Sequence, residues 1–375
     1  MSKLPHIGTS IFTTMAQMAH QYQAINLSQG FPNFPVDSQL KKMVAHWASK
    51  EIHQYLPMAG LPSLLEKIAG LTERSYSRAV NSTTEILITA GATEGIFASI
   101  QALVKQNEEV IILDPSYDCY VTPVLLCNAK PVRISLNDNF TPDWEQIYQA
   151  VNVNTKMIIT NNPHNPSGKI WTAFDFVQLE NLLDLFPNLI VLSDEVYEYI
   201  TFENKHLSVN HRPKLWERTI CVSSFGKSFH VTGWKIGYLI APEHLMTEIK
   251  KVHQFLVFSV NSIAQYAIND YLDSVAIYSL GRFYQKKRDF FQNLMQETKF
   301  DLLPCEGTYF QLASYASFSE EKDLAFSKRL VTDFGVATIP LSPFYADGSE
   351  SKCIRFCFAK DEATLTEAAN RLAKL

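Results

Sequence analysis

Short apolar segments rich in β-branched residues recur through the middle of the chain. They are EILITAG, EEVIILD, KPVRISL, TKMIITN, NLIVLSD, RTICVSS and WKIGYLIAP, between residue 85 and about residue 241. Each has the length and composition of a strand, so seven strands are predicted. Most are separated by stretches with helical spacing, such as 93–105 and 171–186. Strands that alternate with helices indicate an α/β sheet with helices on its faces.

The two ends of the chain have a different pattern. Residues 279–300 predict a charged amphipathic helix, and the later strand candidates, 307–312 and 353–358, are fewer and more widely spaced. No internal repeat or flexible linker interrupts the sequence. We therefore expect a large domain with a mostly parallel seven-stranded sheet and a small α/β domain built from both chain ends. The expected division is 1–45 for the N-terminal arm and part of the small domain, 46–278 for the large domain and 279–375 for the C-terminal small domain.

Composition narrows the function to small-molecule chemistry. The chain has 375 residues, 46% of them hydrophobic, and a net charge of −5. This balance offers no broad basic surface for nucleic acid or an anionic membrane. Neither a signal peptide nor a run of ~18 apolar residues is present, so we expect a cytoplasmic protein. The six cysteines form no CxxC pair, which favours free thiols over disulfides and predicts no metal site.

Polar and aromatic residues gather at the carboxyl ends of the predicted strands. A small-residue turn, 89–95, leads into a helix and suits an anion. The next groups are Asp114-Pro115-Ser116-Tyr117, the segment 161–168 and Asp194-Glu195-Val196-Tyr197. Parallel strands open their carboxyl ends toward one crevice, so these groups predict one ligand site.

Lys227 is the candidate reactive residue. It lies among small and aromatic neighbours in Ser223-Ser224-Phe225-Gly226-Lys227-Ser228-Phe229, after the sixth strand. A partly desolvated lysine favours its neutral, nucleophilic form. A single lysine is most often a solvated surface charge, but the groups at the other strand ends favour the reactive interpretation.

Three motifs carry a family resemblance. They are Ser224-Phe225-Gly226-Lys227, Gly233-Trp234-Lys235-Ile236-Gly237 and Asn162-Pro163-His164-Asn165-Pro166-Ser167-Gly168. From about Leu27 to Phe358 the chain resembles the fold-type I, class I/II aminotransferases, which bind pyridoxal 5′-phosphate (PLP). The resemblance implies that Lys227 holds PLP as a Schiff base.

The same resemblance implies further cofactor contacts. The phosphate would be bound by Ser224, Lys235 and the turn Gly91, Ala92 and Thr93; the phenolic oxygen by Asn165 and Tyr197; the pyridine nitrogen by Asp194; and the two ring faces by Tyr117 and Val196. Tyr55 matches a tyrosine that reaches the phosphate of the neighbouring subunit, which implies a homodimer with shared sites.

Substrate contacts are implied in the same way. Arg355 would grip the α-carboxylate, with Asn165 and a backbone contact from Gly30. The side-chain pocket is expected to contain Phe12, Phe258 and Tyr309, with Ser259 as the only added polar group and no second arginine. Such a lining favours apolar or aromatic amino acids, methionine first.

The expected activity is transfer of the amino group to a 2-oxo acid by a ping-pong mechanism, with Lys227, Asp194 and Tyr197 as catalytic residues. The segments 11–13, 117–120 and 253–259 are similar to the kynurenine/glutamine/methionine group of aminotransferases. A cysteine-S-conjugate β-lyase or a kynurenine/glutamine aminotransferase could use the same site. A transcription regulator needs a further N-terminal domain, and a purely structural protein has no use for a reactive lysine. The sequence leaves open the preferred donor and acceptor, the pathway, any β-lyase side activity and assembly beyond a dimer.

Overall fold

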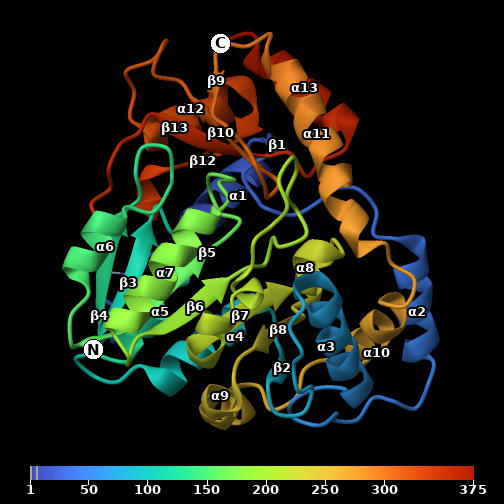
Figure 1. Cartoon of the computed structure of the whole chain (residues 1–375). Coiled ribbons are helices and arrows are strands. Elements are labelled where there is room, and N and C mark those ends of the chain that lie inside the picture. The colour runs from blue at the N-terminus through green and yellow to red at the C-terminus, as the bar shows by residue number, and fades with distance from the viewer. Residues whose placement is uncertain (1, 6) are drawn as a thin grey trace.

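A computed structural model of the chain describes residues 2–5 and 7–375, and a seven-stranded sheet in the order β2-β8-β7-β6-β5-β3-β4 lies at its centre (Figure 1). The strands are β2 (Ile86–Thr89), β3 (Glu109–Asp114), β4 (Lys130–Ser135), β5 (Thr155–Asn161), β6 (Ile190–Asp194), β7 (Thr219–Ser224) and β8 (Gly237–Ile240). β8 is antiparallel to both of its neighbours, and every other pair in this sheet is parallel. The predicted seven strands and the mostly parallel sheet are confirmed.

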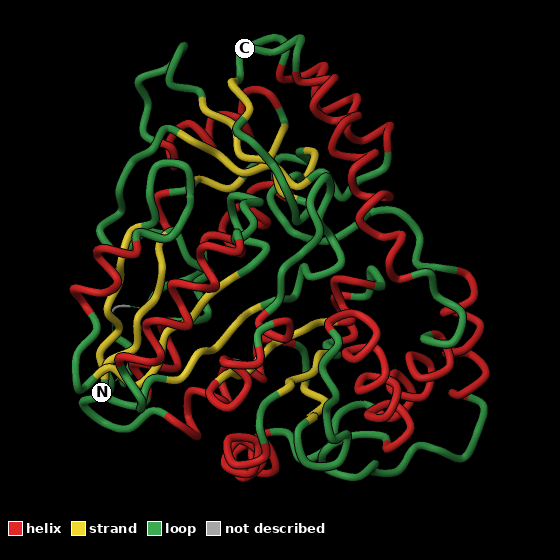
Figure 2. The backbone as a smooth tube through the Cα atoms, in the orientation of Figure 1, coloured by secondary structure: helices red, strands yellow, loops and turns green. Residues whose placement is uncertain are grey.

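Helices cover both faces of this sheet (Figure 2). Because successive strand residues point to opposite faces, Val110 and Ile112 belong to one hydrophobic core and Ile111 to the other. The first core includes residues of α4 (Ala92–Leu103), α9 (Glu243–Leu256) and α11 (Leu280–Met295). The second includes residues of α3 (Pro62–Tyr76), α6 (Trp144–Ala150), α7 (Ala173–Leu185) and α10 (Ser262–Tyr271). Burial on both faces explains why the strands are continuously apolar.

The C-terminal part forms a second, antiparallel sheet in the order β12-β13-β10-β9. Its strands are β9 (Asp301–Leu302), β10 (Phe310–Ser314), β12 (Ile339–Pro340) and β13 (Cys353–Cys357). The helices beside it are α11, α12 (Asp323–Phe334) and α13 (Glu362–Leu372), drawn in orange and red at the top of Figure 1.

The N-terminus joins this C-terminal part. β1 (Ile25–Asn26) pairs in parallel with β11 (Val336–Ala337), and α1 (Ile11–Gln21) packs against α12. By contrast, α2 (Ser38–Ala48) packs against α10, and its Leu40 belongs to the second hydrophobic core of the large sheet. The border expected at residue 45 falls inside α2, and the division into 1–45, 46–278 and 279–375 stays a proposal.

Two predicted elements have different ends in the structure. The helix expected over 279–300 stops at Met295, where a turn with a 3.0 Å bond from Thr298 N to Met295 O closes it and Phe300 enters the core. The strand expected over 307–312 starts only at Phe310, because Thr308 has a positive φ of 66° that interrupts the extended backbone.

All six cysteines are free. Among the described helices, none is long and apolar enough to cross a membrane.

The packing of α11 against the segment that follows β6 can be tested by substitution of Gly281. A Cβ at Gly281 would clash with the carbonyl oxygen of Thr201, which is backbone and cannot rotate away. We expect Gly281→Ala to lower the free energy of unfolding by about 1–3 kcal/mol, although alanine gains about 0.5–1 kcal/mol over glycine within a helix. Urea denaturation measures the change.

Gly70→Ala is the matched control, because a Cβ there would meet only the end of the flexible Arg74 side chain, at 3.1 Å. We expect Gly70→Ala to raise the free energy of unfolding by about 0.5–1 kcal/mol. An equal gain in both variants would show that the contact at Thr201 carries no constraint.

Candidate active site

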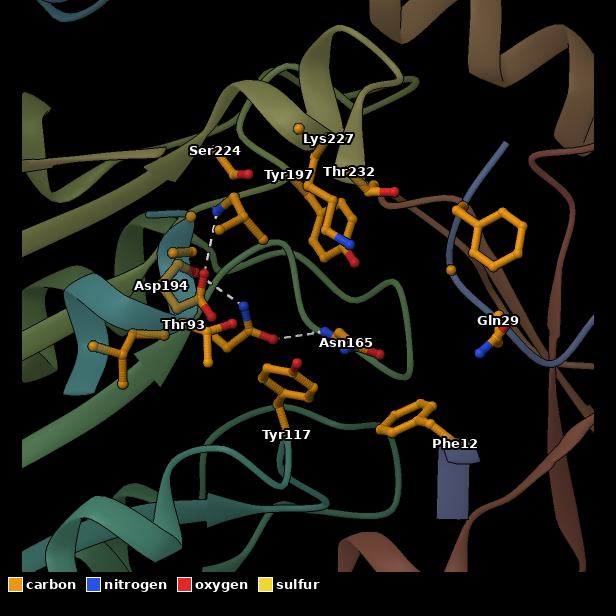
Figure 3. A pocket seen from close by; sticks show the side chains of 18 of the residues that line it. Phe12, Gln29, Thr93, Tyr117, Asn165, Asp194, Tyr197, Ser224, Lys227 and Thr232 are labelled. Carbon is orange, nitrogen blue, oxygen red and sulfur yellow. Dashed lines mark hydrogen bonds between the residues drawn. The ribbon is translucent and has the colours of Figure 1, made fainter. Parts of the chain in front are cut away.

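A cavity of about 530 Å³ opens at the carboxyl ends of the parallel strands (Figure 3). The predicted residues that line it are Phe12, Gly30, Gly91, Ala92, Thr93, Tyr117, Asn165, Asp194, Val196, Tyr197, Ser224, Lys227, Lys235 and Arg355. The cavity is also lined by residues that the sequence motifs did not predict: Ser10, Gln29, Phe31, Ile96, Asp118, Asn161, Gly226, Thr232, Ile236 and Phe310. Most of these are chain neighbours of predicted residues, so adjacency to a motif is the signal that could have found them.

Strand register brings the polar groups at the centre of the cavity together. Asn161 and Asp194 are paired positions at the ends of β5 and β6. Asn161 Nδ2 donates to the carbonyl oxygen of Asp194 at 2.9 Å, and Asn161 Oδ1 accepts from Asn165 N at 2.7 Å. Asn161 therefore fixes the following loop to the neighbouring strand.

Lys227 lies in α8 (Phe225–Ser228), directly after β7. Its Nζ makes no hydrogen bond or ion pair with the described part of the chain, and it lies 5.7 Å from the ring centroids of both Tyr197 and Tyr309. Burial lowers the pKa of Lys227 to about 8, and the nearby cations Arg355 and Lys235 add to that effect. A sizeable fraction of this amine is therefore neutral near pH 8.

Asp194 is 4% exposed at the end of β6. Burial raises its pKa to about 6, while hydrogen bonds from Tyr120 and Val196 oppose the rise. The Tyr120 hydroxyl donates to Oδ2 at 2.6 Å, and Val196 N donates to Oδ1 at 3.3 Å. The carboxyl group is thus mostly ionised at neutral pH although it is buried.

The turn before α4 forms a cationic pocket. Gly91 has a φ of 77°, which favours glycine, and it starts the helix whose N-terminus carries partial positive charge. Lys235 lies against this turn, since a Cβ on Gly91 would stand 3.1 Å from Lys235 Nζ. Ser224, the last residue of β7, lines the same cavity. Together these groups suit a phosphate.

Arg355, in β13, is a buried cation without a counter-ion. It is 1% exposed, and it forms no ion pair within residues 2–5 and 7–375. Its Nη1 donates to Asn165 Oδ1 at 2.7 Å, its Nη2 donates to the Ser28 carbonyl oxygen at 2.9 Å, and its buried Nε has no partner among the described residues. The guanidinium lies 3.9 Å from the Phe310 ring centroid. An unpaired buried charge is costly, so the site favours an anionic ligand.

Four predicted residues do not line the cavity of this chain: Tyr55, Phe258, Ser259 and Tyr309. Tyr55 is 81% exposed, and its ring meets Phe258 edge-on at 5.2 Å. Ser259 Oγ donates to the Leu56 carbonyl oxygen at 3.1 Å. This hydrogen bond joins the segment of Phe258 to the segment of Tyr55, so the Ser259 hydroxyl does not face the cavity.

Tyr309 lies behind the cavity, where its hydroxyl donates to the Gly30 carbonyl oxygen at 2.7 Å. Its place in the lining is taken by Phe310, because neighbouring residues along an extended chain face opposite ways. Tyr309 is therefore not among the described residues that line this cavity, and its hydrogen bond holds the loop that carries Gly30.

Comparisons with known proteins agree with this geometry. The family model described as aminotransferase class I and II matches residues 22–372. The methionine aminotransferase of Escherichia coli K12 is 46% identical, covering 100% of this chain and 98% of that protein. The kynurenine–oxoglutarate transaminase of Dictyostelium discoideum is 32% identical, covering 98% of this chain and 94% of that protein.

Among solved structures, YbdL from Escherichia coli, identified as having a methionine aminotransferase function, has a TM-score of 0.97 and 45% identity, covering 100% of this chain and 99% of that one. Sequence and architecture therefore agree along the whole length. The chain belongs to the class I and II aminotransferases.

Proposed function

We propose that this aminotransferase binds PLP in the cavity and moves an amino group from an apolar or aromatic amino acid, methionine first, to a 2-oxo acid by a ping-pong mechanism. One observation carries the proposal. A desolvated amine, a buried carboxylate and a buried unpaired guanidinium, from Lys227, Asp194 and Arg355, line the same cavity.

The residues around the cavity fit the chemical groups of PLP. The proposed contacts are Lys227 as the covalent attachment; Ser224, Lys235 and the Gly91, Ala92 and Thr93 turn for the phosphate; Asn165 and Tyr197 for the phenolic oxygen; Tyr117 and Val196 for the ring faces; and Asp194 for the pyridine nitrogen. Asn165 Nδ2 supports this assignment, since it makes no hydrogen bond to the described residues while Asn165 Oδ1 is occupied by Arg355. When bound, PLP supplies an electron-accepting ring that stabilises negative charge at the substrate Cα.

The protein's own groups would manage the protons. Lys227 Nζ, with its pKa lowered to about 8, could take the proton from the substrate Cα and deliver it to the cofactor carbon. A base with a pKa near the working pH is the most effective for such a transfer. An ionised Asp194 would keep the pyridine nitrogen protonated. Arg355 would hold the α-carboxylate through its free Nε, with Gly30 supplying a backbone contact, and so orient the Cα–H bond.

The lining of the cavity supports an apolar side chain on the substrate. Phe12, Phe31, Tyr117 and Phe310 are its aromatic residues, and the carboxylate of Asp118 would repel an acidic side chain. Among the described residues that line the cavity, the cations are Lys227, Lys235 and Arg355, all with proposed roles. The 46% identity to a methionine aminotransferase supports methionine as the first donor. The lower identity to a kynurenine–oxoglutarate transaminase supports kynurenine only as an alternative donor.

A homodimer would complete the site. Tyr55, Phe255 and Phe258 are 81%, 86% and 48% exposed. Exposed aromatic residues that lie on nearby segments often mark a protein–protein interface. We propose that they meet a second copy of the chain, with Tyr55 reaching the phosphate in the partner's cavity. The cytoplasmic location stays a prediction.

Lys227→Ala should lower kcat by about 10⁴-fold or more, because the change removes both the attachment point and the proton carrier. Borohydride reduction of the loaded protein followed by peptide mass analysis should find the pyridoxyl group on Lys227. Lys250→Ala is the control. Burial lowers the pKa of this lysine as well, but Lys250 lies on α9, away from the cavity lining, and its Nζ donates to the Thr83 carbonyl oxygen. Near wild-type turnover of Lys227→Ala would refute the assignment.

Mixing Tyr55→Phe subunits with Lys227→Ala subunits should restore activity above the mean of the two parents. If Tyr55 serves the partner's cavity, each heterodimer contains one site with both residues intact. The control mixes Lys227→Ala with Asp194→Asn, whose lesions fall in the same lining and leave every site damaged. Demonstrated heterodimers without any gain would show that Tyr55 does not act across subunits.

Methionine should exceed aspartate in kcat/KM by about 100-fold or more with a common 2-oxo acid, since an unpaired buried carboxylate costs several kcal/mol. Phenylalanine should lie between them or close to methionine, because the aromatic lining discriminates weakly among apolar side chains. Steady-state kinetics of the three donors measure the order. A preference for aspartate would contradict the pocket assignment and leave the PLP assignment intact.

A further inference from the structure

Tyr120 makes a buried contact that the proposed mechanism does not use. It stands just before α5 (Val121–Leu126), and its hydroxyl donates to Asp194 Oδ2 at 2.6 Å. Tyr120 is 2% exposed and Asp194 is 4% exposed. Tyr120 does not line the cavity but lies beside Tyr117, whose ring it meets edge-on at 5.9 Å. It can therefore act on a ligand only through another residue.

The surroundings of Asp194 make this hydrogen bond important. The titratable groups that affect Asp194, or that it affects, are Tyr117, Cys119 and Tyr120 before α5, Glu195 and Tyr197 on its own segment, and Lys227 on α8. Burial raises the pKa of Asp194, and Glu195 adds to that rise. The Tyr120 hydrogen bond is the largest effect in the opposite direction, ahead of Val196 N and Lys227.

The hydroxyl of Tyr120 stays a donor throughout the physiological range. Burial raises its pKa well above the ordinary value, and the Asp194 charge raises it further. A donor that keeps its proton stabilises the ionised form of the carboxylate it contacts. Each carboxylate oxygen accepts more than one hydrogen bond, so the bond to Tyr120 leaves Asp194 able to accept another from the cavity.

We propose that Tyr120 is a positioning residue that keeps Asp194 ionised and fixes the direction in which its carboxylate faces the cavity. The proposal rests on the proposed function, in which Asp194 pairs with the pyridine nitrogen. A purely structural role for Tyr120 needs only its ring, and phenylalanine would supply that ring equally well.

Tyr120→Phe removes the hydroxyl and keeps the packing. The first measurement is the titration of Asp194 in the full-length, cofactor-free chain, followed by ¹³C NMR of labelled aspartate, with Asp194→Asn identifying the signal. We expect the midpoint, about 6 in the wild type, to move up by about one pH unit or more, since a hydrogen bond to a charged group shifts an equilibrium by roughly 10-fold or more. An unchanged midpoint would overturn the proposal without any reference to catalysis.

Tyr315→Phe is the matched control. Tyr315 is also buried and also donates one hydrogen bond, but to the Glu321 carbonyl oxygen at 2.9 Å in the C-terminal part of the chain. It should leave both the Asp194 titration and the PLP dissociation constant unchanged. A shift of the same size in Tyr315→Phe would show that the effect is general loosening of the fold and would overturn the proposal.

The second measurement uses the loaded enzyme and PLP binding. In Tyr120→Phe the acid limb of the kcat profile should move to higher pH, the PLP dissociation constant at pH 7 should rise by about 10-fold, and KM for the amino acid should stay within about 2-fold because Arg355 is untouched. Adding Tyr120→Phe to Asp194→Asn should cause no further loss, since the two residues act as one unit. Fully additive losses would overturn the proposal.

The action of Tyr120 on Asp194 and the role of Asp194 toward the pyridine nitrogen can be refuted independently. A shifted Asp194 midpoint together with wild-type turnover of Asp194→Asn would support the action of Tyr120 on Asp194 and overturn the role of Asp194 in the proposed function.

Discussion

Because β5, β6 and β7 are parallel neighbours, their carboxyl ends lie at one edge of the sheet, with Asn161 beside Asp194 and Asp194 beside Val222. Every other feature of the site depends on this register. A slip of one residue would turn Asp194 to the opposite face of the sheet, away from the cavity. The continuous apolar character of these strands protects the register, since helices bury them on both sides. The hydrophobic cores thus determine where the polar groups stand.

The same burial sets the chemistry. Desolvation lowers the pKa of Lys227 and raises that of Asp194, because in each case it disfavours the charged form. The two residues nevertheless need opposite outcomes in the proposed function: a lysine that loses its proton easily and a carboxyl group that stays ionised. Lys227 has no hydrogen-bonding partner within the described residues, so desolvation prevails there. Asp194 receives hydrogen bonds from Tyr120 and Val196, which offset part of the effect.

Arg355 is where distant parts of the chain meet. Its guanidinium is held by Asn165 from the loop after β5 and by the carbonyl of Ser28 near the N-terminus, while β13 carries its backbone. The loop with Gly30 is tied in turn to Tyr309. The N-terminal and C-terminal segments must therefore assemble on the large sheet before the unpaired cation faces the cavity. This arrangement explains how one buried arginine can orient a small anionic substrate.

The sequence by itself determined the strands, the polar groups at their ends and the motif around Lys227, because these depend on local composition and on the order of elements along the chain. It also placed Asp194, Asn165 and Arg355 in one site through family resemblance, and the structure brings all three to the cavity. Only the tertiary structure decided that Phe310 replaces Tyr309 in the lining, that Tyr55 and Phe258 lie outside it and that Asn161 and Tyr120 support Asp194. Side-chain direction depends on where an extended segment begins, and Thr308 with its positive φ sets that point for β10. The partner of a buried carboxylate depends on packing between segments 74 residues apart in the chain, which no local pattern encodes.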